Sequence, residues 1–150
     1  MVLFLATGCF TGYSPFVPGT TGTLAAIPIY FFLSRLPPLY YTLILLGSIY
    51  VAIWASDRAE VILQTRDCRH IVIDEMVGFI VAMFLVPPTL GNILGGFFLF
   101  RALDIIKPFP IRALEERVRG GYGVVLDDII AGIYANLIFH VLRFTMLKGG

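Results

Sequence analysis

Charge-free stretches dominate the pattern of hydrophobic and polar positions along the chain. The first charged side chain is Arg35, and further stretches without Asp, Glu, Lys or Arg cover 36–56, 76–100 and 129–142. A helix needs about 20 apolar residues to cross a bilayer, so the stretch 36–56 predicts a complete membrane span. Two consecutive prolines interrupt the stretch 76–100, which predicts two short helices that meet at a turn.

These stretches predict five helices that cross the membrane in alternating directions. The predicted helices cover 22–36, 39–56, 74–86, 92–106 and 129–147. Most of the charged residues lie between them in two blocks, 57–75 and 101–128, which this path places on the same side of the membrane. Eight of the eleven Lys and Arg residues belong to these blocks. The positive-inside rule makes that side cytoplasmic.

The composition agrees with a membrane protein. Hydrophobic residues make up 58% of the 150 residues and charged residues only 14%, against about 25% charged residues in soluble domains. A disordered chain, a basic nucleic-acid binder and an ordinary soluble globule are excluded, and the length fits a single domain over 1–150. We therefore expect an all-α fold, a polytopic membrane bundle of short helices with an interfacial active site that faces the cytoplasm. No nucleic-acid partner is expected, and an oligomer is left open.

The stretch 12–23 combines two prolines, three glycines and four Ser or Thr hydroxyls. This composition predicts a loop that becomes helical only at its end. Thr20, Thr21 or Thr23 could cap a helix that starts at Leu24. Backbone N–H groups at a helix start also bind phosphate, so Thr20 and Thr23 are candidate substrate ligands. The alternative is a capped turn without a ligand.

Two acidic pairs, Asp74-Glu75 and Asp127-Asp128, stand at the beginning of predicted apolar helices. Acids in a first turn favour the helix dipole, which is the simpler explanation for either pair alone. Two such pairs and Asp104 on the same side of the membrane are more than capping requires. A glycine-rich loop, 120–123, is expected to deliver the second pair.

Arg101, Asp104 and Lys107 are spaced three residues apart, which places them on one stripe of a helix. Pro108 and Pro110 then end that helix. The stripe could be an internal set of ion pairs. It could equally provide two phosphate ligands, Arg101 and Lys107, beside one metal ligand.

Carboxylates from three separate stretches are therefore expected to converge near the membrane surface. An oxygen-only ligand set suits Mg²⁺, whereas the spacing of His and Cys offers no zinc site. The five candidate metal ligands are Asp74, Glu75, Asp104, Asp127 and Asp128, and Asp67 is a further candidate. Together with Arg101 and Lys107 they predict a Mg²⁺-dependent enzyme that acts on a phosphoryl group presented from the membrane.

The motifs, taken together and in this order, closely resemble the phosphatidylglycerophosphatase A family over about 8–134. They are Ser14-Pro15 and Pro18-Gly19-Thr20, Gly22 to Ala26, Ile71 to Glu75 with Gly78, Phe100-Arg101 with Asp104 and Lys107-Pro108, and Gly120-Gly121 with Asp127-Asp128 and Ala131-Gly132. The resemblance implies a multi-pass lipid phosphatase of the bacterial inner membrane that depends on Mg²⁺. Such an enzyme converts phosphatidylglycerophosphate to phosphatidylglycerol and inorganic phosphate.

The mechanism expected from these residues assigns catalytic roles to Asp74, Asp104, Asp127 and Asp128. Asp127 is the candidate base for an attacking water, with an aspartyl-phosphate intermediate as the alternative. Two other functions stay open at this point. One is a membrane phosphotransferase of the CDP-alcohol type, although its aspartate signature is missing. The other is a non-enzymatic subunit of a divalent-cation transporter.

Overall fold

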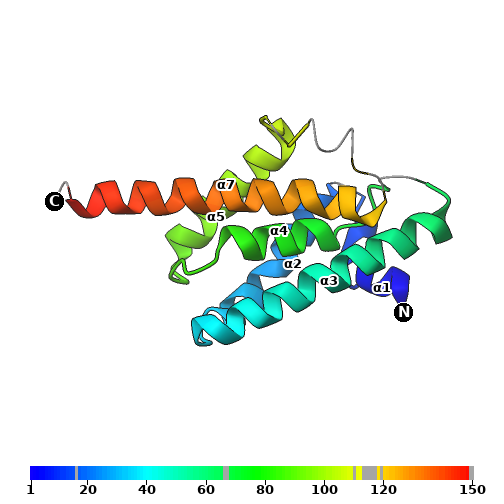
Figure 1. Ribbon diagram of the computed structural model, residues 1–150, viewed down its shortest axis with the longest axis horizontal. Helices are drawn as coiled ribbons and strands as arrows, with labels where there is room; N and C mark the ends of the chain where they lie inside the picture. Colours follow the sequence, from blue (N-terminus) through cyan, green and yellow to red (C-terminus); the bar gives the residue numbers. More distant parts are fainter. Residues whose placement is uncertain (16, 66–67, 110, 113–117, 119, 149–150) are drawn as a thin grey trace.

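The computed structural model describes residues 1–15, 17–65, 68–109, 111–112, 118 and 120–148, and their regular structure is entirely helical (Figure 1). Its elements are α1 (Val2–Ala6), the short 3-10 helix η1 (Thr11–Tyr13), α2 (Pro18–Leu33), α3 (Pro38–Leu63), α4 (Ile73–Ala82), α5 (Leu90–Ile106) and α7 (Gly121–Lys148). The short helix α4 lies inside the bundle, in contact with α2, α3, α5 and α7. The C-terminal part of α7 extends beyond the other helices. The expected all-α fold is confirmed.

Helix α2 begins earlier than the sequence predicts, and its start is not capped by a threonine. Pro18 is the first helical residue, and the preceding Val17 makes no side-chain capping bond. Proline suits this position because its fixed φ matches a helix and its missing N–H would have no partner there. The prediction that 12–23 stays non-helical until its end, with a threonine cap, is therefore wrong.

The two longest helices extend past the apolar stretches that predict them. Helix α3 continues through Asp57 to Leu63, beyond the predicted end at residue 56. Helix α7 begins at Gly121, well before the predicted start at residue 129. A Cβ on Gly121 would lie 2.3 Å from the carbonyl oxygen of Ile53, so the start of α7 is in tight contact with α3. Asp127 and Asp128 consequently lie in the second turn of α7 rather than at its beginning.

The two short helices predicted for 74–106 are confirmed as α4 and α5, joined by a turn that contains the two prolines. Glycines allow α4 and α7 to touch. A Cβ on Gly132 would lie 2.4 Å from the carbonyl oxygen of Gly78, and a Cβ on Gly78 would lie 2.8 Å from that of Asp128. This close packing brings the acidic residues of α7 against those of α4.

Side chains from the surrounding helices bind the backbone carbonyls where α4 ends. Each carbonyl that α4 would otherwise leave without a helical N–H needs such a donor in an apolar setting. The hydroxyl of Tyr30 donates to Val86 O (2.6 Å) and that of Tyr41 to Ile80 O (2.8 Å), while the amide of Asn136 donates to Ala82 O (2.9 Å) and Phe84 O (2.8 Å). Three helices, α2, α3 and α7, therefore hold the end of α4 in place.

Two of the described helices are long and apolar enough to cross a membrane, namely Pro38–Leu63 and Gly121–Thr145. Their most apolar windows are only 22% and 33% buried inside the protein. A soluble protein usually buries such helices in its core, so the exposed apolar surface favours a membrane setting. Helices α2, α4 and α5 are shorter, with 16, 10 and 17 residues. The five crossings stay a prediction.

Candidate active site

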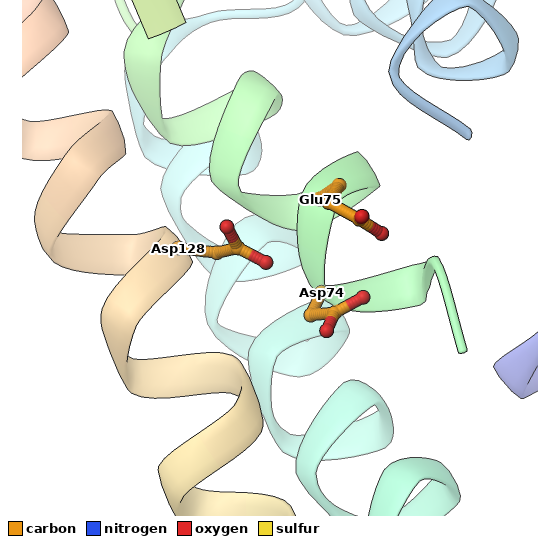
Figure 2. Close-up of side chains that lie close together, drawn as sticks. All are labelled: Asp74, Glu75 and Asp128. Atoms are coloured by element: carbon orange, nitrogen blue, oxygen red, sulfur yellow. The ribbon is translucent and has the colours of Figure 1, made fainter. Parts of the chain in front are cut away.

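Three carboxylates meet at the contact between α4 and α7 (Figure 2). Asp74 and Glu75 lie in the first turn of α4, and Asp128 lies opposite them on α7. Each provides one oxygen, and these oxygens all lie within 4.8 Å of one another. Asp74 and Asp128 are only 6% and 3% exposed. The predicted convergence of distant acidic residues is thus present for three of the five.

These carboxylates contain buried oxygen atoms that have no hydrogen-bond partner, namely Asp74 Oδ1, Glu75 Oε2 and Asp128 Oδ1. Burying a carboxylate oxygen that has no hydrogen-bond partner costs on the order of several kcal/mol. A divalent cation that prefers oxygen ligands would satisfy all three. The residues present therefore fit a bound Mg²⁺.

The three acids are crowded together in a buried setting, and their unpartnered oxygens can bind either protons or a cation. Protons and a metal cation would therefore compete for the same oxygens.

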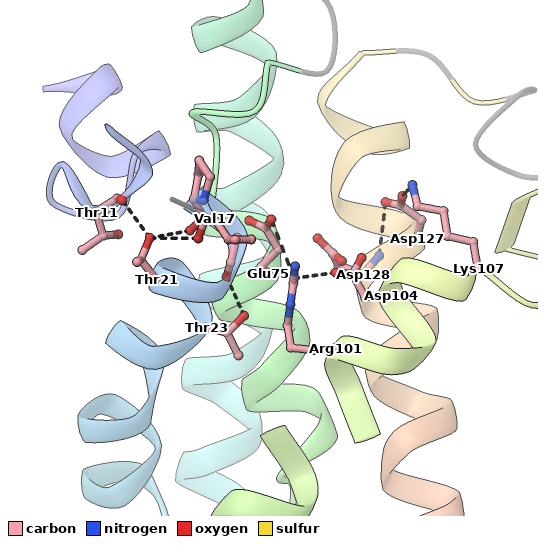
Figure 3. Close-up of polar contacts among 12 residues, drawn as sticks. Thr11, Val17, Thr21, Thr23, Glu75, Arg101, Asp104, Lys107, Asp127 and Asp128 are labelled. Carbon is pink, nitrogen blue, oxygen red and sulfur yellow. Dashed lines mark hydrogen bonds and ion pairs between the residues drawn. The ribbon is translucent and has the colours of Figure 1, made fainter. Parts of the chain in front are cut away.

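Arg101 on α5 joins Asp104 to this cluster (Figure 3). Its Nη1 donates to Asp104 Oδ2 at 2.5 Å and lies 3.9 Å from Glu75 Oε1. Asp104 also interacts with Asp128. Arg101 is largely buried, and its Nε has no hydrogen-bond partner. A buried guanidinium with an unused donor, placed beside a set of acids, is suited to bind a phosphoryl oxygen.

Lys107 and Asp127 form a pair of their own at the edge of the cluster (Figure 3). Lys107 Nζ donates to Asp127 Oδ2 at 2.6 Å, and the backbone N–H of Asp128 donates to Asp127 Oδ1 at 3.1 Å. Both oxygens of Asp127 are thus engaged, and Asp127 does not belong to the three-carboxylate group. Lys107 follows the last residue of α5 in a left-handed conformation, so the predicted stripe continues only to Asp104 within the helix.

The start of α2 lies directly against this cluster, although the sequence places the start of this helix several residues later. A Cβ on Gly19 would lie 2.1 Å from Glu75 Oε1 and 3.0 Å from an Arg101 guanidinium nitrogen. The backbone N–H groups of Gly19 and Thr20 precede the first hydrogen bond of the helix, in which Thr21 N donates to Val17 O at 3.1 Å. The proline before Gly19 is the signal that could have placed this helix start correctly.

The predicted substrate ligands on α2 differ in their surroundings. Thr23 is fully buried, and its hydroxyl donates to Gly19 O at 2.8 Å. Thr20 is half-buried in the first turn, next to Gly19. Both roles stay predictions, as do the catalytic roles of the acids. Asp67, the further candidate ligand, lies outside the described residues.

A sequence model of the family described as phosphatidylglycerophosphatase A matches residues 4–143. The chain belongs to the phosphatidylglycerophosphatase A family. It is 35% identical to the Escherichia coli K12 protein of that name over 92% of this chain and 81% of the relative. The Haemophilus influenzae phosphatidylglycerophosphatase A is 32% identical over 95% and 89% of the two chains. The sequence-based expectation of a phosphatase of this type is confirmed.

A third relative, from Bacteroides thetaiotaomicron, is also 35% identical, over 96% of this chain and 94% of its own length. It carries the provisional name phosphatidylinositol-3-phosphatase. Different lipid headgroups are thus associated with closely similar chains. No solved structure matches this phosphatidylglycerophosphatase A family member significantly.

Proposed function

We propose that the chain is a Mg²⁺-dependent phosphatase of the bacterial inner membrane. It hydrolyses phosphatidylglycerophosphate to phosphatidylglycerol and inorganic phosphate. Family membership supplies the substrate, and one structural observation carries the chemistry: three buried carboxylates with unpartnered oxygens next to a buried arginine. This combination of an oxygen ligand set and a fixed positive charge suits a phosphoryl group with its cation.

Asp74, Glu75 and Asp128 are the residues that would hold Mg²⁺, with Asp104 beside them. When bound, the cation offsets negative charge on the phosphoryl oxygens. The same role was predicted for Asp127, but its pairing with Lys107 supports a different one. We propose that Asp127 positions Lys107 at the rim of the site, where the ammonium group attracts the anionic headgroup.

Arg101 and the start of α2 form the phosphate-binding side of the proposed site. Arg101 has an unused Nε donor, and Gly19 and Thr20 have backbone N–H groups at the positive end of a helix. Figure 3 shows Arg101 between Glu75 and Asp128, and Gly19 lies against both Glu75 and Arg101. A terminal phosphate bound by these donors would lie next to the carboxylates that would hold the cation.

The reaction requires a base for the attacking water. Asp104 has one oxygen paired with Arg101, and its second oxygen could accept the proton. The water oxygen then forms a bond to phosphorus while the bond from phosphorus to the glycerol oxygen breaks. That oxygen takes up a proton from solvent water, and Asp104 later returns its proton to solvent. Asp104 replaces Asp127 as our proposed base because both oxygens of Asp127 are occupied.

The proposed location rests on the distribution of charge and apolar surface. The two long helices expose apolar side chains along their length. The carboxylate cluster lies where α4 begins and near the start of α7, so it is at one end of the bundle (Figure 1). Eight of the eleven Lys and Arg residues belong to the sequence blocks 57–75 and 101–128, which supports a cytoplasmic orientation for the site.

Metal removal tests the proposal directly. We expect purified enzyme in detergent to release phosphate from phosphatidylglycerophosphate with Mg²⁺, and to lose at least about a hundredfold in rate with EDTA. Activity should return when excess Mg²⁺ is added. Full activity in EDTA would contradict the metal role, and transfer of a lipid group to an alcohol or cation uptake into liposomes would favour the two alternative functions.

The headgroup is a second question, raised by the Bacteroides relative. Phosphatidylinositol 3-phosphate, assayed beside phosphatidylglycerophosphate under the same conditions, distinguishes the two substrates. We expect phosphatidylglycerophosphate to have the higher kcat/KM. The opposite ranking would keep the phosphatase chemistry and change the substrate.

A further inference from the structure

An apolar groove lies between four helices on the side of α4 that faces away from α7. It has a volume of about 460 Å³. Its lining comes from α4, from one face of α3, from Ile29 on α2, and from α1 and the turn after it, and it is almost wholly hydrocarbon. Volumes of roughly 300–1,000 Å³ and apolar linings are typical of sites for small ligands.

The groove and the carboxylate cluster lie on different faces of α4, next to each other at the start of the helix. Ile73, Met76 and Ile80 line the groove, while Asp74 and Glu75 turn into the cluster. Residues 73 and 80 are seven positions apart, so the groove follows α4 for about 10 Å. Its near end is therefore beside the acids, and its far end lies deeper along the bundle.

The far end of the groove opens to the outside. Ile29 on α2 and Ile44 on α3 line it there and are 43% and 44% exposed. In the proposed membrane setting, these side chains face lipid. An acyl chain could thus enter from the bilayer and lie along α4 toward the acids.

Gly47 on α3 has no side chain to fill the groove. A Cβ at Gly47 would meet no other atom within 4 Å, although the residue lines the groove. Gly78 and Gly132 are different, because helix contacts leave no room for a side chain there. Packing therefore explains Gly78 and Gly132 but not Gly47, whose missing side chain keeps the groove open.

We propose that this groove binds one acyl chain of the phospholipid substrate and thereby places its phosphate at the cluster. The inference rests on the proposed function and adds the part of the substrate that the acids do not recognise. The second acyl chain stays in the bilayer. Because hydrocarbon is also the solvent around the protein, the groove contributes orientation of the headgroup rather than a large gain in affinity.

Filling the groove at Gly47 is the test, with Gly91 as its matched control. Gly91 is also an exposed helical glycine whose Cβ would meet nothing within 4 Å, and it does not line the groove. We expect Gly47→Phe to lower kcat/KM for long-chain phosphatidylglycerophosphate by about tenfold. The deacylated headgroup should be hydrolysed at the same rate by Gly47→Phe and wild type, and Gly91→Phe should match wild type on both substrates.

Two outcomes of this assay overturn the groove assignment. One is unchanged kcat/KM of Gly47→Phe on the long-chain substrate. The other is an equal loss on the long-chain and deacylated substrates, because a groove for the acyl chain does not act on the headgroup alone. Absence of phosphate release by wild type from either substrate would instead contradict the proposed function.

A binding measurement tests the groove without turnover. Phosphatidylglycerol with a photoreactive group in one acyl chain is the probe, in vesicles of phosphatidylcholine. We expect irradiation to label the peptides that carry residues 44–51 and 73–80, and Gly47→Phe to reduce that labelling several-fold while Gly91→Phe leaves it unchanged. Equal labelling of all three proteins would overturn the proposal.

Discussion

The two acidic pairs of this chain look alike in the sequence and differ in the structure. Asp74 and Glu75 both contribute to the three-carboxylate group, whereas only Asp128 of the second pair does so. Asp127 instead binds Lys107. Each pair occupies neighbouring helical positions, which point about 100° apart.

Side-chain length contributes to the difference. The extra methylene of Glu75 lets its carboxylate reach toward Asp74 and Arg101 in spite of the angle between the two positions. Asp127 has no such reach, and it meets the lysine at the end of α5 instead.

The largest loss of activity is expected when a member of the three-carboxylate group is replaced, compared with an acid elsewhere in the chain. Asp74→Asn and Asp128→Asn should each reduce kcat by about a thousandfold or more, since each removes a charge from the proposed cation site. Asp57→Asn is the matched control, because Asp57 on α3 is exposed, lies outside the group and keeps an acceptor oxygen for Gly121 N. Phosphate release at saturating Mg²⁺ measures all three. Near-normal kcat in Asp74→Asn would remove it from the site.

A smaller effect is expected at Asp127. Asp127→Asn should lower kcat/KM by about 10- to 100-fold, the range typical of residues that act through another group. Lys107→Met should cost about as much, and the double variant should cost little more than either one, because both changes break the same pair. A loss in Asp127→Asn as large as that in Asp128→Asn would show that the two acids act alike after all.

The smallest effect concerns pH. The crowded carboxylates of the group can bind protons, which Mg²⁺ must displace. The Mg²⁺ concentration for half-maximal activity should therefore rise as pH falls from about 8 toward 6, by at most about tenfold per pH unit for each proton displaced. Glu75→Gln removes one of these proton sites and should make the dependence less steep. A pH-independent Mg²⁺ requirement in the wild type would contradict it.

The sequence predicts which segments are helical better than it predicts the residues at which those helices begin and end. The break in the stretch 76–100 correctly separates α4 from α5 because proline cannot continue a helix. The predicted starts of α2 and α7 were wrong because the prolines and glycines of 12–23 and the glycines of 120–123 were interpreted as loops. Gly121 and the glycines before Leu24 are helical through contacts with other helices, which no local pattern reports.

The same limit applies to the site. Clustering of the acids near the membrane surface follows from where the charges lie, and Asp74, Glu75 and Asp128 confirm it. The separation of Asp127 from the group depends on how α7 is rotated against α4 and α5. That rotation is set by Gly78 and Gly132, whose contact across the helix pair appears only in three dimensions.

The hydrogen bonds that Tyr30, Tyr41 and Asn136 make to the end of α4 have a consequence for biosynthesis. A ten-residue helix with unpaired carbonyls enters hydrocarbon poorly by itself. Asn136 is translated after α4, so the full set of donors exists only once α7 has been made. We therefore expect α4 to insert stably only after α7 has been made, so assembly of the carboxylate cluster depends on α7.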